Sequence, residues 1–362
     1  MKGTINLRQA SCIMGILVFA NKVLILPSVM FEKVGVDGIF LLVGLFLVDL
    51  FMLWVFFKLK RKFPDKTFFE LLTKVITKYG AIFVYVLFCG FFVMKALTIY
   101  NVSLMYLKNQ VYFEAGEFLF LICFLTLSNN LALRGLRSTA RTTEFFYFGI
   151  ILLIVLSTYA ACANFGELPV FFNNSLGKLF TSSFNYLFCF GDVLFLFLIM
   201  DKIEIKKEKQ RTMYICVIVN MVLTFLLYGV FFSVFKYTGF MHNNAASDVI
   251  TFSNNFAGVG RIDILSVIVI MFLNYFQLSF FNLAFQSSFS AIFPKGNKII
   301  STIIYDLLFV VLLYFFVSDY TQVFAIDTNI MPYFALVLQY IIPTICLVAT
   351  LFKRRKEDEE IS

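Results

Sequence analysis

Charged residues are scarce in this chain of 362 residues, because Asp, Glu, Lys and Arg together make up only 14% of it. An ordinary soluble domain carries roughly a quarter charged residues, so this composition cannot cover a water-exposed surface of normal size. The scarcity excludes a soluble enzyme and a disordered chain. The net charge of +8 must then be explained by where the surplus Lys and Arg residues lie, and no nucleic-acid partner is predicted.

Residues and motifs that carry catalysis or bind metals are also nearly absent. The single His242 has no Cys or His beside it, and none of the seven cysteines forms a C-x-x-C pair. We therefore predict no metal site and no disulfide framework, and interpret the cysteines as small buried hydrophobic residues. The chain also lacks the phosphate-binding G-x-x-x-x-G-K-[ST] motif and the H-E-x-x-H zinc motif. No catalytic residue, no cofactor and no enzymatic activity are predicted.

Hydrophobic residues make up 60% of the chain, 50 residues are Phe, and the mean hydropathy is +0.88. A transmembrane helix needs about 20 apolar residues, and ten runs of this kind are separated by charged or turn-rich breaks. We therefore predict an all-α membrane protein with ten transmembrane helices. The predicted spans are 11–31, 39–57, 81–106, 117–133, 145–163, 180–200, 212–235, 263–290, 299–317 and 331–352.

The segment between the second and third spans has a different pattern. Residues 65–80 place apolar side chains at helical spacing between charged ones. This pattern predicts a short amphipathic helix lying on the membrane surface.

Lys and Arg residues alternate strongly between the two sides of the predicted bundle. With the N-terminus taken as cytoplasmic, 23 of the 30 Lys and Arg residues fall on that side, five fall on the other, and two lie inside spans. Because Lys and Arg in short loops resist translocation, this bias predicts that both termini are cytoplasmic. We expect an integral protein of a bacterial inner membrane, of the cell or of the spore.

Four ionisable residues lie near the middle of their spans, where a charge costs about 2.5–3.5 kcal/mol to insert. They are Lys22, Asp49, Lys95 and Asp192, and their formal charges sum to zero. Asp306 lies in the ninth span, nearer the cytoplasmic end. These groups either form structural ion pairs between helices or line a polar site. In a transporter, Asp49, Asp192 and Asp306 would couple a proton or cation to the substrate.

Two spans are interrupted at mid-depth. The first is interrupted at Asn21-Lys22 and has a second half that ends at Pro27, and the sixth is interrupted at Gly191-Asp192. They are the first members of two sets of five helices, a pattern that indicates an inverted repeat with a substrate site between the broken helices. We predict one transmembrane domain with repeats at 1–163 and 164–352 and a charged cytoplasmic tail at 353–362.

A broken helix leaves backbone N–H and C=O groups free, which is tolerated only beside protein or a polar cavity. The N–H groups favour a carboxylate and the C=O groups favour an ammonium, so a zwitterionic amino acid would satisfy both. In the eighth span, Asn274 and Gln277 share one helical face, while Asn282 and Gln286 share another. One face is expected to line a cavity and the other to bond neighbouring helices.

Several local patterns, in this order and spacing, resemble the spore-germination permease family. This family supplies the B-type membrane subunit of nutrient germinant receptors and belongs to the amino acid–polyamine–organocation superfamily. The resemblance covers residues 6 to about 352. The similar segments are Phe19–Pro27, Val34–Gly38, Lys60–Leu72 (KRKFPDKTFFELL), Arg134–Glu144 (RGLRSTARTTE) and Phe190–Asp192 (FGD).

The resemblance implies a LeuT-like five-plus-five inverted repeat, with binding residues on the first, third, sixth and eighth helices. It also implies a receptor in the inner spore membrane that works with an A-type subunit and a lipoprotein C-type subunit. Two residues depart from the family pattern. Lys22 stands where a small residue is usual, and Asp192 replaces the commoner Glu. The Lys22 ammonium would then either take the place of a substrate amine or coupling cation, or pair with Asp192.

Two functions follow as hypotheses. In the first, a small nutrient, most simply an amino acid, binds between the first and sixth helices and shifts a conformational equilibrium. In the second, the chain is a proton- or cation-coupled amino acid permease. For either one, the expected binding residues are Ala20, Asn21, Lys22, Lys95, Phe190, Gly191, Asp192, Asn274 and Gln277.

Overall fold

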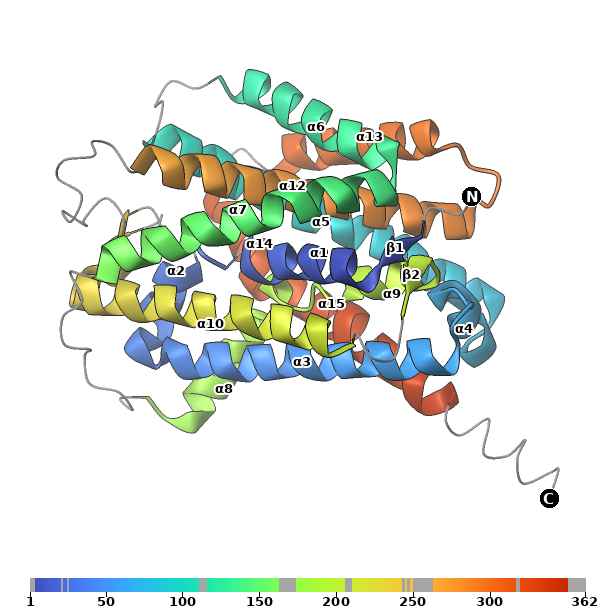
Figure 1. The fold of residues 1–362 in the computed structure, drawn as a ribbon, viewed down its shortest axis with the longest axis horizontal. Helices are drawn as coiled ribbons and strands as arrows, with labels where there is room; N and C mark the ends of the chain where they lie inside the picture. The colour runs from blue at the N-terminus through green and yellow to red at the C-terminus, as the bar shows by residue number, and fades with distance from the viewer. Residues whose placement is uncertain are drawn as a thin grey trace.

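The computed structural model describes residues 4–20, 22–24, 26–110, 116–162, 174–205, 210–242, 245, 248–249, 263–316 and 320–350. Its long helices run side by side in one bundle (Figure 1). Within the described residues, seven helices are long and apolar enough to cross a membrane. They span Leu26–Lys62, Lys78–Asn109, Glu117–Arg134, Gln210–Phe235, Val267–Ile292, Lys298–Phe315 and Met331–Thr350. The ten-helix count stays a prediction.

Each of these seven helices overlaps one of the predicted spans. They comprise α3 (Gly38–Lys62), α5 (Lys78–Gln110), α6 (Glu117–Arg134), α10 (Gln210–Phe235), α12 (Asp263–Ile292), α13 (Lys298–Phe316) and a last helix that starts as α15 (Met331–Ala335). A further helix of 27 residues, α7 (Leu136–Cys162), covers the predicted fifth span. The bundle is completed by α14 (Tyr320–Asn329) and by the 3₁₀ turn η5 (Lys236–Met241).

The first span is interrupted, as predicted. Helix α1 (Leu7–Ala20) ends before the break, and α2 (Leu26–Val34) begins after it. The prediction that the second half ends at Pro27 is wrong, because Pro27 lies in the first turn of α2, where a missing N–H costs no helical hydrogen bond. Helix α2 is joined to α3 by only the three-residue 3₁₀ turn η1 (Gly35–Asp37). Gly35 adopts a φ of 63° there, a left-handed conformation that glycine reaches without steric cost.

The sixth span is also interrupted, as predicted. Helix α8 (Leu176–Asn185) is followed by the 3₁₀ turn η2 (Leu187–Cys189), and the short helix α9 (Leu194–Leu198) begins only after a non-helical turn. A second 3₁₀ turn, η3 (Met200–Lys202), ends the segment. No helix of membrane-spanning length forms between residues 174 and 205 of the described chain.

A two-stranded parallel sheet ties the two interrupted segments together at one end. Strand β1 (Ile5–Asn6) directly precedes α1, and strand β2 (Ile203–Glu204) follows η3. Ile5 pairs with Ile203, and Asn6 pairs with Glu204. Strands of two residues leave no recognisable alternation in a sequence, so this sheet was not predicted.

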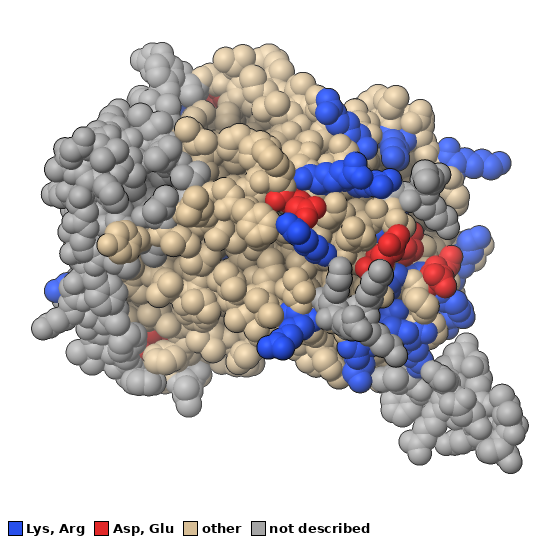
Figure 2. All heavy atoms as spheres, viewed as in Figure 1, with Lys and Arg blue, Asp and Glu red and all other residues tan. Residues whose placement is uncertain are grey.

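Lys and Arg side chains gather at the end of the bundle where β1, β2 and α4 lie (Figures 1 and 2). Lys62, at the end of α3, donates a hydrogen bond to the carbonyl of Thr350, the last described residue. The start of α1 and the end of the last helix therefore lie at the same basic end. This arrangement fits the predicted segregation of positive charge, and the cytoplasmic orientation itself stays a prediction.

Large apolar side chains cover much of the outer surface. Exposed examples occur on several helices, including Leu47, Phe118, Phe145 and Tyr314. In water such a surface would promote association, whereas hydrocarbon accommodates it at no cost. The apolar exterior and the spanning helices together describe an integral membrane protein.

The predicted amphipathic helix is present as α4 (Phe68–Val75) and is shorter than the segment 65–80. Its apolar side chains Phe68, Leu71 and Leu72 are buried. A capping box fixes its start. The Thr67 hydroxyl accepts a hydrogen bond from the Glu70 N–H (3.1 Å), and the Glu70 carboxylate accepts one from the Thr67 N–H (3.2 Å).

We predict that Thr67→Ala will loosen α4 locally. Loss of an N-cap of this kind costs about 1 kcal/mol, so amide hydrogen exchange of residues 68–75 should become roughly fivefold faster. Thr73→Ala is the matched control, because the Thr73 hydroxyl bonds only the Glu70 carbonyl within the helix. Equal exchange rates in the two variants would show that the capping box does not set the stability of α4.

Candidate functional site

The break in the first span begins where α1 ends. Ala20 is buried as the last helical residue, and Asn21 lies outside the described residues. The Lys22 N–H donates to the carbonyl of Phe19 (3.1 Å), and the Lys22 carbonyl accepts a hydrogen bond from the Tyr228 hydroxyl on α10 (2.8 Å). The backbone of this break is therefore held by neighbouring protein, as a non-helical segment inside a membrane requires.

The break in the sixth span depends on Gly191. Its φ is 76°, and its N–H donates a hydrogen bond to Asp49 Oδ1 on α3 (2.8 Å). The left-handed turn brings Asp192 to the start of the next helical turn, where the Asp192 carbonyl accepts from the Phe195 N–H (3.0 Å). Asp49 thus anchors the turn that carries Asp192.

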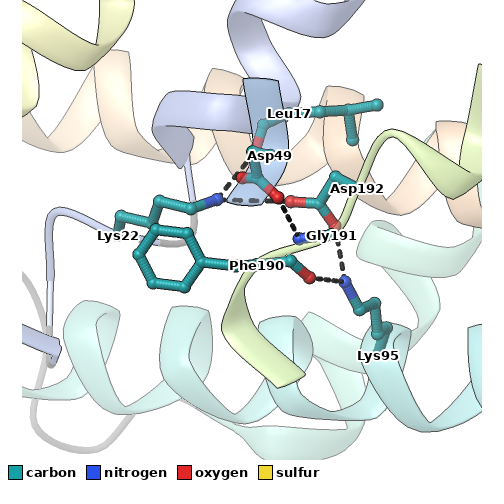
Figure 3. A network of polar contacts seen from close by, with 7 residues as sticks. All are labelled: Leu17, Lys22, Asp49, Lys95, Phe190, Gly191 and Asp192. Atoms are coloured by element: carbon teal, nitrogen blue, oxygen red, sulfur yellow. Dashed lines mark hydrogen bonds and ion pairs between the residues drawn. The ribbon is translucent and has the colours of Figure 1, made fainter. Parts of the chain in front are cut away.

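Asp192 lies between two lysines from different helices (Figure 3). Its Oδ1 is 2.6 Å from Lys95 Nζ on α5, and its Oδ2 is 3.3 Å from Lys22 Nζ in the first break. All three residues, and Asp49 beside them, are at most 4% exposed. Removing ions from water costs several kcal/mol each, and close pairing with further hydrogen bonds is needed to offset that cost.

A backbone carbonyl beside each break accepts a second hydrogen bond from one of the lysines. Lys95 Nζ donates to the Phe190 carbonyl (3.1 Å), and Lys22 Nζ donates to the Leu17 carbonyl near the end of α1 (3.4 Å). Both ammonium groups also face aromatic rings. Lys22 Nζ lies 4.8 Å from the centre of the Phe190 ring, and Lys95 Nζ lies 5.6–5.8 Å from three others, those of Phe91, Phe188 and Phe281. Ring faces attract cations when water is excluded.

The structure thus brings together the four central charges that the sequence places in four separate spans. It also answers how Lys22 is accommodated, because the ammonium pairs directly with Asp192. Lys22, Lys95 and Asp192 form ion pairs between helices, and their part in binding a ligand stays a prediction.

The two amides expected to line a cavity have different surroundings. Asn274 donates to the hydroxyl of Ser103 on α5 (2.8 Å), so it joins α12 to α5. Gln277 is fully buried, and neither of its side-chain polar atoms has a hydrogen-bond partner among the described residues. Thr98, one turn beyond Lys95 on α5, donates to Asp327 Oδ2 on α14 (2.8 Å).

Asp306 belongs to a different polar network. Its Oδ2 accepts a hydrogen bond from Asn129 on α6 (2.7 Å). Asn129 Oδ1 in turn accepts from Asn282 (2.6 Å), and Gln286 bridges Asn282 and Thr302. This network bonds α6, α12 and α13 to one another, as predicted for the second amide face of the eighth span. No ion pair or hydrogen bond joins Asp306 to the central charges within the described residues.

Several buried polar residues near the centre were not predicted. They are Asp327, Gln339, Tyr340 and Tyr228. Gln339 is the only amide or charged side chain between residues 331 and 352, and that isolation could have identified it. Asp327 lies outside every predicted span, so the search for charges inside spans could not reach it.

The described residues contain no group of three or more His, Cys, Asp and Glu side chains that could hold a metal ion. His242 lies 3.4 Å from Asp248 in the loop after α10. The chemistry available at the centre is therefore that of two ammonium groups, nearby carboxylates and backbone carbonyls. Such a set recognises charged groups of both signs.

Comparison with known proteins agrees with the family resemblance and the transporter fold. The family described as "Spore germination protein" matches residues 4–322. No curated protein gives a significant match. A similar solved structure is that of Mhp1, a nucleobase-cation-symport-1 family transporter, in a closed conformation with bromovinylhydantoin bound. It superposes with a TM-score of 0.62 at 11% identity, and the match covers 92% of this chain and 76% of the Mhp1 chain.

The inward-facing conformation of Mhp1 superposes with a TM-score of 0.55, also at 11% identity, over 98% of this chain and 78% of that one. At this identity the similarity shows the fold alone. The matching family is thus one of spore germination proteins, and the fold is that of Mhp1. The ten-helix count and the inverted repeat stay predictions.

We predict that Gly191→Ala will destabilise the protein strongly. A left-handed backbone costs an ordinary residue about 1–2 kcal/mol, and a Cβ here would overlap Gln339 Oε1 and lie 2.8 Å from the Tyr340 hydroxyl. Gly44→Ala is the control, because Gly44 lies in α3 with open space around its α-carbon. Thermal unfolding in detergent should show a lower midpoint for Gly191→Ala only.

We predict that Asp192 and Lys95 are energetically coupled. Asp192→Asn leaves two buried ammonium groups without their shared carboxylate and should cost about 3–5 kcal/mol. Adding Lys95→Met should recover part of this loss, with a coupling energy of about 1–3 kcal/mol.

Lys108→Met supplies the matched control, because Lys108 lies on the same helix and pairs with Glu117 instead. Its effect should add to that of Asp192→Asn within about 0.5 kcal/mol. Additive effects for the Lys95 pair in equilibrium unfolding would contradict a direct ion pair.

Proposed function

Because the chain belongs to the spore germination protein family, we propose that it is the integral membrane subunit of a spore nutrient germinant receptor. The proposed ligand is an amino acid or a similar small nutrient. It binds at mid-membrane between the two interrupted segments and triggers germination by shifting a conformational equilibrium. The observation that carries this proposal is the buried Asp192 between two lysines, at the point where both helices are broken.

The central groups match the two ends of an amino acid. The ammonium groups of Lys22 and Lys95 suit a ligand carboxylate, and the Asp192 carboxylate suits a ligand ammonium. The carbonyls of Leu17 and Phe190, which now accept from the lysines, offer further acceptors to that ammonium. The carboxylate of a zwitterionic ligand can therefore replace Asp192 as partner of the lysines, and its ammonium can replace a lysine as partner of Asp192.

Exchange of partners explains how binding would change conformation. In the closed arrangement, Asp192 holds the sixth-span turn against α5 and against the first break. A ligand that takes over one or both lysines releases those contacts and makes its own. It shifts the equilibrium only to the extent that it binds the released state better than the closed one. The proposed contacts are those expected from the sequence, with the backbone of residues 20–22 and 190–192 as the main surfaces.

Three finer statements belong to the same proposal. The chain has ten transmembrane helices in a five-plus-five inverted repeat, a view supported by breaks in the first helix of each half. Its basic end is cytoplasmic and its membrane is the inner membrane of the cell or spore, a view supported by the gathered Lys and Arg side chains (Figure 2). Its partners are an A-type subunit and a lipoprotein C-type subunit, which the family supports.

A second function, a proton- or cation-coupled amino acid permease, is favoured by one specific observation. Asp49 and Asp192 meet at Gly191, where Asp49 accepts the N–H of the residue that precedes Asp192. Two carboxylates so close, with lysines beside them, would suit a site that takes up a proton or cation together with substrate. Asp306 would act separately, within its own network.

One experiment separates the two functions. The purified chain is reconstituted in liposomes, an inward proton gradient is imposed, and uptake of each radiolabelled amino acid is followed over time. For a receptor we expect a rapid, saturable intercept with no slope. A slope that disappears when the gradient is collapsed would instead show a coupled permease.

Two variants test the site in the same assay. Asp192→Asn should lower the saturable signal at least tenfold, because the ligand ammonium loses its counter-charge. Asp306→Asn is the control and should leave binding unchanged. The proposal fails if no amino acid binds, or if Asp192→Asn, shown to be folded, binds as the wild type does.

A further inference from the structure

The last helix carries a feature that none of the contacts above explains. Residues Leu336–Ile341 (η7) form a π-helical turn within an otherwise α-helical segment. Single π-helical turns are rare and occur frequently at functional sites. Two neighbouring residues of this turn, Gln339 and Tyr340, have buried polar side chains.

Both side chains reach the Gly191 turn. A Cβ on Gly191 would meet Gln339 Oε1, Gln339 Cδ and the Tyr340 hydroxyl before any other atoms. The absence of a side chain at Gly191 is thus what allows these two groups to approach the backbone between Phe190 and Asp192. They lie against the same turn that carries the central carboxylate.

The polar side-chain atoms of both residues are buried without hydrogen-bond partners among the described residues. Gln339 is 1% exposed and Tyr340 is 7% exposed. Within the described part of the chain, Gln339 Nε2, Gln339 Oε1 and the Tyr340 hydroxyl have no hydrogen-bond partner. A buried polar group without a partner costs about 1–3 kcal/mol. A sequence selected only for packing would place apolar residues here, as it does at nearly every other position of this helix.

We propose that Gln339 and Tyr340 form a specificity subsite that binds the side chain of the ligand. This inference rests on the proposed function, in which the central charges bind the ligand's ammonium and carboxylate. The subsite offers two amide donors, one amide acceptor and a hydroxyl, and it carries no charge of its own. It therefore fits a neutral side chain that both donates and accepts hydrogen bonds, with a carboxamide as the best match.

Such a subsite discriminates between polar and apolar ligands because its buried polar atoms cost free energy when no ligand group hydrogen-bonds them. A site built to hydrogen-bond a polar group rejects an apolar analogue strongly, because its own buried polar atoms then stay unsatisfied. L-Asparagine and L-leucine test this directly, since their side chains have nearly the same shape and differ in polarity. The subsite should favour asparagine.

The experiment measures equilibrium binding of radiolabelled L-asparagine and L-leucine to the purified full-length chain in nanodiscs. The variants are Gln339→Met and Tyr340→Phe, which keep side-chain volume and remove the polar atoms. Each should reduce the preference for asparagine over leucine at least tenfold. Tyr314→Phe is the matched control, because Tyr314 is exposed on the outer surface of α13, and it should change nothing.

Thermal unfolding without ligand supplies an independent readout. Removing an unsatisfied buried polar group is neutral or stabilising, so Gln339→Met should unfold at the same temperature as the wild type or higher. A structural role for the amide would instead lower the unfolding temperature. That outcome would overturn the proposal.

The remaining outcomes separate this inference from the proposed function. If the wild type binds leucine as tightly as asparagine, or if both variants weaken the two ligands equally, the subsite assignment is wrong and the receptor proposal stands. If the wild type binds none of the twenty amino acids, the proposed function itself fails.

Discussion

The need to neutralise Asp192 inside the bundle governs the rest of this structure. A carboxylate removed from water is stable only with close positive partners, and here two lysines from different segments provide them. Those lysines in turn require acceptors and polarisable surroundings. The broken helices provide the acceptors as free carbonyls, and phenylalanine rings provide the surroundings. The same breaks that weaken two helices therefore make the buried charges tolerable.

The contacts that stabilise the centre of the bundle are also the contacts that a ligand at the proposed site would have to replace. The ion pairs hold the first break, α5 and the sixth-span turn together at the place proposed for the ligand. Lys22 adds a positive charge that a small residue would not supply, so the chain itself provides an ammonium where a ligand amine could otherwise bind. A ligand must therefore compete with contacts that are already well formed, which favours molecules that carry both charges and rejects those that carry one.

The broken helices and the four central charges could be predicted because each is visible in the local sequence. Asn21-Lys22 and Gly191-Asp192, for example, interrupt runs that are otherwise apolar. It could not predict which charges meet, since pairing across four spans depends on packing that no local pattern records. Asp306 shows the same limit, because it also lies inside a predicted span while its hydrogen-bond partner is the amide of Asn129. Gln339 was missed because one amide barely changes the hydropathy of a long apolar run.

The short sheet between β1 and β2 limits how the two interrupted segments can move. It joins the start of α1 to the segment after α9 at the basic end of the bundle. Any rotation that keeps these strands paired has its pivot there, so displacement grows with distance along α1. A small tilt at this pivot becomes a larger displacement at Lys22, which lies just beyond the far end of α1 and pairs with Asp192.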